Sequence, residues 1–237
     1  MVESVAVIHR VLSSGSSFPS VVETAAGHRY VLKLAGAGPG RRALATELVA
    51  LKLCQHLGLS VPDIELLDLS IDLPWQTGTD EFYEAAQRST GLNLGIVFLA
   101  DTRDVTAGEL AALPQDFLAR LGAADALLQN VDRTRANPNI LRDRNETHWA
   151  IDFGACLLIE RLARGAIAPR LDLPANHFLA GDRTFAHSVR AAAEAIGAAD
   201  LQSILELVPE PWLEDFGLVR QTLLDRLLAY LDAVRAT

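Results

Sequence analysis

Two stretches of the chain decide its fold: Asn130-Val131-Asp132-Arg133-Thr134-Arg135-Ala136-Asn137 and Ile151-Asp152-Phe153-Gly154. Asn137 stands five positions after Asp132, and Asp152 fifteen positions after Asn137. Phosphoryl transfer needs a carboxylate that orients the attacking hydroxyl and accepts its proton. It also needs an Asn and an Asp that hold Mg²⁺ against the phosphates of a nucleotide. The two stretches place these groups in the required order. A lone Asp132 would be interpreted as a turn or capping residue, so the ordered combination carries the prediction.

A lysine and a glutamate upstream fit the same chemistry. The run Tyr30-Val31-Leu32-Lys33 has the character of a strand, and Glu47 falls in the helix predicted next, beside an apolar stripe that includes Leu48. In phosphotransferases of this kind a strand lysine contacts the α- and β-phosphates and a helix glutamate holds it. We therefore predict that Lys33 binds phosphates and that Glu47 supports it. The competing interpretations are a lysine that guards a strand edge and a solvated glutamate.

A serine-rich loop before Lys33 is the predicted phosphate cover. It runs Ser13-Ser14-Gly15-Ser16-Ser17-Phe18-Pro19-Ser20, and its backbone N–H groups and hydroxyls can cradle phosphates. The loop has neither the Walker A pattern nor Gly-x-Gly-x-x-Gly, so an ordinary polar turn is the competing interpretation. The predicted nucleotide contacts in it are Ser14, Gly15, Ser16 and Ser17.

The pattern of apolar residues divides the chain into a β-rich part and a helical part. Strands are predicted over 4–8, 20–24, 28–34, 63–69 and 94–99, and helices from about 41 to a C′ residue at Gly58 and over 79–88. After a polar linker at 101–104, helices are predicted over 107–128, split at Pro114, and around 185–196 and 218–234, with two short strands around 140–141 and 149–151. The expected fold class is α+β, with a small β-rich N-terminal lobe over 1–104 and a mostly helical C-terminal lobe over 105–237.

Composition excludes several classes of protein. Hydrophobic residues make up 50% and charged residues 22% of the chain, an ordinary globular balance. Lys plus Arg is 21 and Asp plus Glu is 30, so the net charge of −9 gives no drive toward nucleic acid or an anionic membrane. Cys54 and Cys156 provide neither a disulfide framework nor a zinc spacing. Without a signal-peptide pattern or a membrane-length apolar run, the expected location is the cytoplasm.

These segments together resemble the small bacterial HipA-like kinases and, more distantly, the protein-kinase and phosphoinositide-kinase folds. The resemblance covers roughly residues 10–160. It runs through six segments, namely 30–33, Arg42-Ala43-Leu44 with Glu47, 57–62, Gly91-Leu92-Asn93-Leu94-Gly95, 130–139 and 151–154. The C-terminal helices match only in character.

The resemblance implies a two-lobe, protein-kinase-like fold with ATP in the cleft between the lobes. Within it, Asp132 corresponds to the catalytic Asp, and Asn137 and Asp152 to the Mg²⁺ ligands. Lys33 corresponds to the phosphate-binding lysine, and Phe98-Leu99 to the hinge beside adenine. The implied cofactors are ATP and Mg²⁺.

Two further residues leave alternatives open. Asn139 competes with Asn137 as a metal ligand, although Asn137 has the better spacing. Asp125, seven positions before Asp132, either braces the catalytic loop or faces solvent. Two departures from the family also matter. Val131 replaces the Arg that precedes the catalytic Asp in many protein kinases, which argues against an Arg-dependent activation switch. The extra N-terminal domain of full-length HipA toxins is also missing, which puts toxin–antitoxin pairing in doubt.

The function expected from the sequence is ATP–Mg²⁺-dependent phosphoryl transfer, with a Ser or Thr of a protein as the leading acceptor. Asp132 is expected to position the acceptor hydroxyl. One alternative is a small-molecule or lipid kinase of the same superfamily, although the acidic charge argues against lipid headgroups. The other is a pseudokinase that binds partners without turnover, which the complete catalytic set argues against. The identity of the acceptor and the oligomeric state stay open.

Overall fold

The computed structural model describes residues 2–12, 17–70, 72, 78–181 and 185–237. It confirms a mixed α+β chain whose N-terminal part is rich in strands and whose C-terminal part is mostly helical. The chain groups into two compact units, one made of residues 1–44 and 62–100, the other of 45–61 and 101–237. The assignment of two lobes of one kinase-like domain, over 1–104 and 105–237, stays a prediction.

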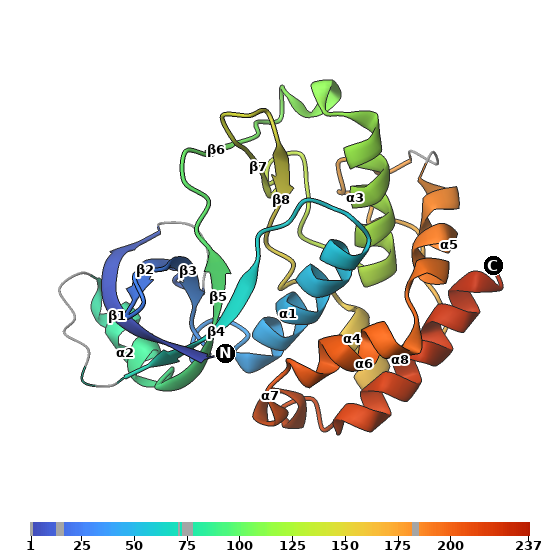
Figure 1. Ribbon diagram of the computed structural model, residues 1–237. Helices are drawn as coiled ribbons and strands as arrows, with labels where there is room; N and C mark the ends of the chain where they lie inside the picture. Colours follow the sequence, from blue (N-terminus) through green and yellow to red (C-terminus); the bar gives the residue numbers. More distant parts are fainter. Residues whose placement is uncertain (1, 13–16, 71, 73–77, 182–184) are drawn as a thin grey trace. The chain divides into compact units, whose positions relative to one another are not determined.

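The first unit is built on a closed barrel (Figure 1). Its strands are β1 (Val2–Val11), β2 (Ser20–Thr24), β3 (Arg29–Lys33), β4 (Ile64–Leu69) and β5 (Gly91–Val97). They follow the order β1-β2-β3-β5-β4, and β1 closes the barrel by pairing in parallel with β4. Because β3 lies between β2 and β5, Lys33 is not on a strand edge and the strand-edge interpretation of this lysine is wrong.

A short helix, α2 (Asp80–Gln87), packs on the core of this unit. Its N-terminus is capped by Thr79, whose hydroxyl oxygen accepts a hydrogen bond from the backbone N–H of Phe82. The helix buries Phe82, Ala85 and Ala86. These side chains join a cluster that contains Val5, Val22, Tyr30, Leu32, Leu34, Ala37, Leu67 and Leu69. The barrel and α2 therefore share one hydrophobic core. Burial of each large apolar side chain in this core stabilises the fold by about 1.5–3 kcal/mol.

Helix α1 (Arg41–His56) ends as the sequence predicts. The backbone N–H of Leu59 donates to the carbonyl of Cys54, and that of Gly58 donates to the carbonyl of Gln55, both at 3.0 Å. These two bonds form a Schellman motif, which needs a left-handed residue at its C′ position. Gly58, with φ of +70°, takes that position without the steric cost that a Cβ would add.

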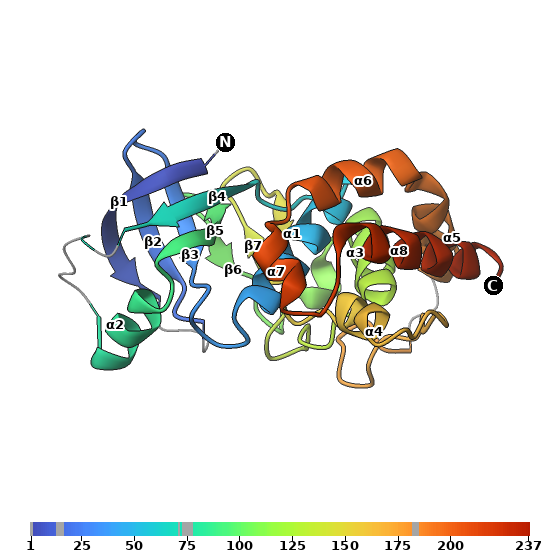
Figure 2. The same ribbon diagram turned by 90° about the horizontal axis from the view of Figure 1, so that it is seen from below.

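The second unit is a set of packed helices. They are η1 (Leu110–Ala112), α3 (Gln115–Leu128), α4 (Leu158–Ala163), α5 (Ala186–Ala195), α6 (Ala198–Glu206), α7 (Glu210–Glu214) and α8 (Arg220–Arg235). The break predicted at Pro114 separates η1 from α3. Helix α8 packs against α4, α5 and α6, and α3 against α5 (Figure 2). None of the helices that the described residues form has the length and apolar character of a membrane span.

A small antiparallel sheet holds the predicted catalytic segments in this unit. It consists of β6 (Arg103–Asp104), β7 (Ile140–Arg142) and β8 (His148–Ala150), in the order β6-β7-β8. The linker predicted over 101–104 is therefore partly wrong, because Arg103 and Asp104 pair with β7. Residues 130–139 connect α3 to β7, and Asp152 follows β8.

Candidate functional site

The loop over 130–139 starts at a sharp helix end. Gln129 follows the last residue of α3 in the left-handed conformation, with φ of +59°. The backbone N–H of Asn130 then donates to the carbonyl of Asp125 at 2.9 Å, which turns the chain away from the helix axis. The side-chain oxygen of Asn130 accepts a hydrogen bond from the backbone N–H of Asp132 at 3.1 Å, an Asx turn. The helix end thus fixes the start of the loop two residues before Asp132.

Asp132 faces two amides of its own loop. Its Oδ2 atom accepts hydrogen bonds from Nδ2 of Asn137 at 3.1 Å and from Nδ2 of Asn139 at 3.3 Å. Among the described residues, its Oδ1 atom has no hydrogen-bond partner. The side chain is half-buried. One carboxylate oxygen is therefore held in place by the protein, and the other is available to accept a proton from a bound hydroxyl.

Asp152 is brought to the same loop by the backbone of the residue before it. The N–H of Ile151 donates to the carbonyl of Asn139 at 3.0 Å. Asp152 itself has φ of +59° and Asn139 has φ of +51°, so both occupy the left-handed region, which few non-glycine residues adopt and in which Asp and Asn are the most frequent of them. Backbone conformations of this kind cluster at functional sites. The structure thus joins the segments that carry Asp132, Asn137 and Asp152 in one region of the second unit.

A buried ion pair lies beneath this loop. Asp125 and Arg133 are both fully buried, and Nε of Arg133 donates to Oδ2 of Asp125 at 2.6 Å. Asn130 donates through Nδ2 to Oδ1 of Asp125 at 2.9 Å, and Nε2 of His177 lies 3.0 Å from Oδ2. Of the two interpretations of Asp125, the structure confirms that it braces the loop. Sequence reasoning missed Arg133 and His177 as its partners.

The other N–H groups of Arg133 contact backbone carbonyls of the loop and of the residue that follows β8. Its Nη1 atom donates to the carbonyls of Pro138 and Asn139, both at 2.8 Å, and its Nη2 atom lies 3.5 Å from the carbonyl of Ile151. The guanidinium carbon lies 4.9 Å from the ring centre of Phe153, a cation–π contact. One planar group thus ties together the loop and both neighbours of Asp152.

The electrostatics of this cluster are set by burial and by opposed charges. Burial alone would raise the pKa of the Asp125 carboxyl, but the charge of Arg133 and the hydrogen bonds from His177 and Arg133 hold that pKa below its ordinary value. Glu47 is 1% exposed, so the solvated interpretation of this glutamate is wrong. Burial raises the pKa of the Cys156 thiol, and the charges of Asp125 and Glu47 raise it further.

The other predicted site residues stand in the first unit. Lys33 is 9% exposed on β3. Phe98 and Leu99 are half-buried after β5, and the N–H of Phe98 donates to the carbonyl of Arg29. Ser17 is half-buried in a turn, and Ser14, Gly15 and Ser16 lie outside the described residues. The ion pair predicted between Lys33 and Glu47 stays a prediction.

The donor set at the loop fits Mg²⁺. The carboxylate of Asp152 and the side-chain oxygen of Asn137 are hard oxygen donors, and Mg²⁺ prefers one or two carboxylates together with waters and substrate phosphates. Within the described ranges, no three His, Cys, Asp or Glu side chains gather as a closed metal cage. A site for Mg²⁺ completed by a nucleotide needs no such cage.

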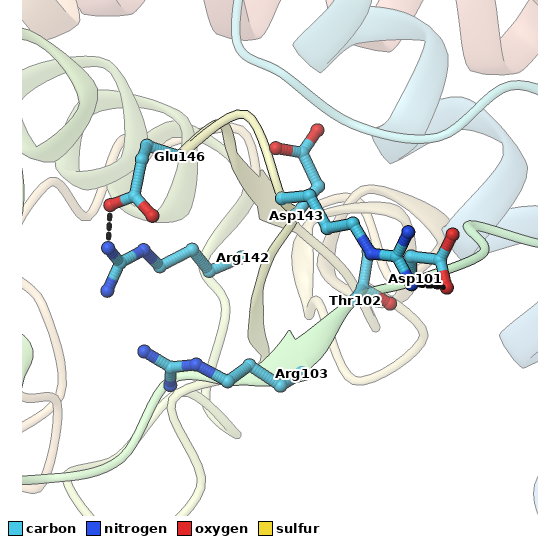
Figure 3. Close-up of a pocket in the computed structure, with 7 residues that line it drawn as sticks. Asp101, Thr102, Arg103, Arg142, Asp143 and Glu146 are labelled. Carbon is cyan, nitrogen blue, oxygen red and sulfur yellow. Dashed lines mark hydrogen bonds and ion pairs between the residues drawn. The ribbon is translucent and has the colours of Figure 1, made fainter.

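A hollow of about 290 Å³ lies elsewhere, on the small sheet (Figure 3). It is lined by Asp101, Thr102, Arg103, Arg142, Asp143, Arg144 and Glu146, none of which is a predicted site residue. Arg103 and Arg142 stand opposite each other on β6 and β7, as Figure 3 shows, and their charges are balanced by carboxylates. Glu109 pairs with both arginines, Glu146 with Arg142, and Asp101 with Arg144. The side chains that line this hollow thus form a network of surface ion pairs.

Comparisons with known proteins give the family and the fold of the chain. The family model described as HipA-like kinase matches residues 5–233. A search of curated proteins found no match. Among solved structures, the chain is similar to one described as the crystal structure of a Helicobacter pylori proinflammatory kinase, CtkA. The TM-score is 0.61 at 14% identity, over 96% of this chain and 93% of that one, which shows a common fold.

Proposed function

Because the chain belongs to the HipA-like kinase family, we propose that it transfers the γ-phosphate of ATP to the hydroxyl of a serine or threonine in a protein. The observation that carries this proposal is the arrangement at Asp132. One carboxylate oxygen is bonded to Asn137 and Asn139, and the other has no partner among the residues described. That is the geometry required of a group that receives a hydroxyl and its proton.

In the proposed step, the acceptor hydroxyl donates a hydrogen bond to Oδ1 of Asp132. The acceptor oxygen forms a bond to the γ-phosphorus as the bond to the β,γ-bridging oxygen breaks, and ADP leaves. The hydroxyl proton passes to Asp132 and later to solvent. Asn137 and Asp152 are the proposed holders of Mg²⁺, which when bound neutralises charge on the phosphates. The ordered amides beside Asp132 keep its carboxylate oriented throughout.

The first unit is proposed to bind the nucleotide. Lys33 supplies a cation for the phosphates, Ser14, Gly15, Ser16 and Ser17 supply loop contacts, and Phe98 and Leu99 contact adenine. Glu47 is the proposed partner of Lys33. Burial of Lys33 in the interior strand β3 supports this role, because a buried ammonium is costly unless an anion accompanies it.

The two lysines of the chain provide a matched test of nucleotide binding. Lys33→Ala should weaken ATP affinity by about 10- to 100-fold, since a charge-assisted hydrogen bond is worth about 1.5–3 kcal/mol. Lys52→Ala should leave ATP affinity unchanged, because Lys52 is half-buried on α1 and its Nζ bonds to Gln55. Isothermal titration with ATP and Mg²⁺ measures both variants. Equal losses would show that Lys33 is not a phosphate ligand.

Metal dependence should appear in the thermal stability of the protein. A ligand present at about 100 times its Kd adds about 2.7 kcal/mol, which for a chain of this size shifts Tm by roughly 5–10 °C. We expect that shift for ATP with Mg²⁺ and a much smaller one with EDTA, because Asp132 and Asp152 repel metal-free phosphates. Asp152→Ala should erase most of the difference. Differential scanning fluorimetry with and without ATP gives the four Tm shifts, and equal shifts with Mg²⁺ and EDTA in the wild type would exclude the metal role.

A further inference from the structure

His177 lies far from the catalytic loop in sequence and directly beneath it in the structure. It belongs to the irregular segment between α4 and α5, and its side chain is 1% exposed. Its backbone forms an isolated β-bridge with Thr134, which lies two residues after Asp132. Its Nε2 atom lies 3.0 Å from Oδ2 of Asp125. The sequence motifs assign no role to this histidine.

The hydrogen bonds of the ring determine where its proton is. The backbone N–H of Leu179 lies 3.0 Å from Nδ1 of His177. Because a backbone N–H can only donate, Nδ1 must be the unprotonated, accepting nitrogen. The proton of the neutral ring is then on Nε2, which donates it to Oδ2 of Asp125. Both ring nitrogens are satisfied, and only this tautomer satisfies them.

The bond from His177 acts on the loop through two further groups. Oδ2 of Asp125 accepts from both His177 and Arg133, so the histidine fixes the direction in which this oxygen faces the guanidinium. Arg133 in turn holds the carbonyls of Pro138 and Asn139, and Asn139 bonds to Asp132. A rotated Asp125 carboxylate would therefore shift Arg133 and the loop that carries Asp132.

We propose that His177 is a positioning residue for phosphoryl transfer, which holds the Asp125 carboxylate as a neutral Nε2–H donor and through it the loop of Asp132. The inference rests on the proposed function, since it assigns His177 to the same reaction. A displacement of about 1 Å at reacting groups can cost about 100-fold in rate. A purely structural histidine would change the stability of the fold and leave the kcat of the folded protein intact.

Two amide substitutions separate the two ring nitrogens. In His177→Gln the amide nitrogen stands where Nε2 stands, so the donor to Asp125 is kept and the acceptor for Leu179 is lost. In His177→Asn the amide oxygen stands where Nδ1 stands, so the acceptor is kept and the donor is lost. Each variant loses one of two buried hydrogen bonds, and the bond to the charged Asp125 is the stronger of the two. The variants are therefore compared by the kcat of the folded protein and not by their stability.

The experiment measures kcat and KM for ATP at a temperature where circular dichroism shows every variant folded. We expect His177→Asn to lower kcat by about 10- to 100-fold with KM nearly unchanged, and His177→Gln to stay within a few-fold of the wild type. His187→Asn, on an exposed position of α5, is the matched control and should keep full activity. Equal kcat in His177→Asn and the wild type, or equal losses in the Asn and Gln variants, would overturn the inference.

A spectroscopic readout keeps the inference testable if His177→Asn does not fold. In the wild-type protein, ¹⁵N chemical shifts of the His177 ring should show a protonated Nε2 and an unprotonated Nδ1 at neutral pH. The opposite tautomer would overturn the inference. An inactive wild-type protein would instead contradict the proposed function itself, while an active wild type with an unaffected His177→Asn variant contradicts only the role of His177.

Discussion

Asp132→Asn is expected to lower phosphoryl transfer by at least about 100-fold, because positioned general acid–base groups contribute about 10²–10⁴-fold to rate. The substitution is nearly isosteric, and the replacement amide oxygen can still accept from Asn137 and Asn139, so the loop should keep its shape. What is lost is the second carboxylate oxygen and the ability to take the hydroxyl proton. ATP affinity should stay close to that of the wild type.

The measurement is the initial rate of ADP formation with saturating ATP and Mg²⁺, together with ATP affinity by titration. Asp116→Asn, an exposed carboxylate at the start of α3, is the control and should be fully active. A rate for Asp132→Asn within a few-fold of the wild type would remove Asp132 from the reaction. Loss of ATP binding together with activity would point to unfolding or to a role in metal binding alone.

Asp125→Ala is expected to have the largest effect on stability, about 3–5 kcal/mol. Removal of this carboxylate leaves the guanidinium of Arg133 buried without an opposite charge and leaves Asn130 and His177 without an acceptor. Urea unfolding measures the loss. The exposed Asp225→Ala on α8 is the control and should change the free energy of unfolding by less than about 0.5 kcal/mol.

A paired replacement isolates the origin of that loss. Asp125→Leu combined with Arg133→Met removes both charges and should recover the part of the loss that comes from the unpaired guanidinium, because a buried ion pair is often no better than apolar residues of similar volume. The part that comes from the unpaired Asn130 and His177 should remain. Phosphoryl transfer should stay low in this variant, since Met cannot hold the carbonyls of Pro138 and Asn139. A loss below about 1 kcal/mol in Asp125→Ala would contradict the buried-charge account.

Acid should reduce the contribution of Asp125. Its pKa is lower in the folded state than its ordinary value of 3.8, so its stabilising effect is fully present above that value and is lost as the pH falls through the folded-state pKa. The difference in free energy of unfolding between the wild type and Asp125→Ala should therefore be constant near neutral pH and shrink in acid below about pH 4.

The local elements of this fold follow from local signals in the sequence. The strand around Lys33, the helix end at Gly58 and the break at Pro114 each depend on residues within a few positions, and each appears where it is predicted. The helices α4, α6 and α7 are too short to give a clear period. Strand β6 exists because it pairs with β7. The β-propensity of its two residues alone is too weak a signal to predict a strand.

In the candidate site, too, some residues can be predicted from local sequence signals and others depend on contacts between distant segments. Asp132, Asn137 and Asp152 are recognisable because their spacing is fixed by a loop and a short hairpin. The support beneath them depends on contacts across long separations, such as the 52 positions between Asp125 and His177. Arg133 was visible next to Asp132, but its burial follows only from the tertiary packing around Phe153. Sequence patterns therefore predict candidate reacting groups and miss the buried network beneath their loop.

The most direct test of the central claim is transfer of the labelled γ-phosphate of ATP to a library of serine- and threonine-containing peptides, with Mg²⁺ present. The account predicts label recovered as phosphoserine or phosphothreonine with the wild-type protein, and none above background with Asp132→Asn. Label found only as inorganic phosphate, or on small-molecule alcohols and not on peptides, would contradict the protein acceptor. No transfer and no ATP binding by a folded wild-type protein would contradict the kinase activity itself.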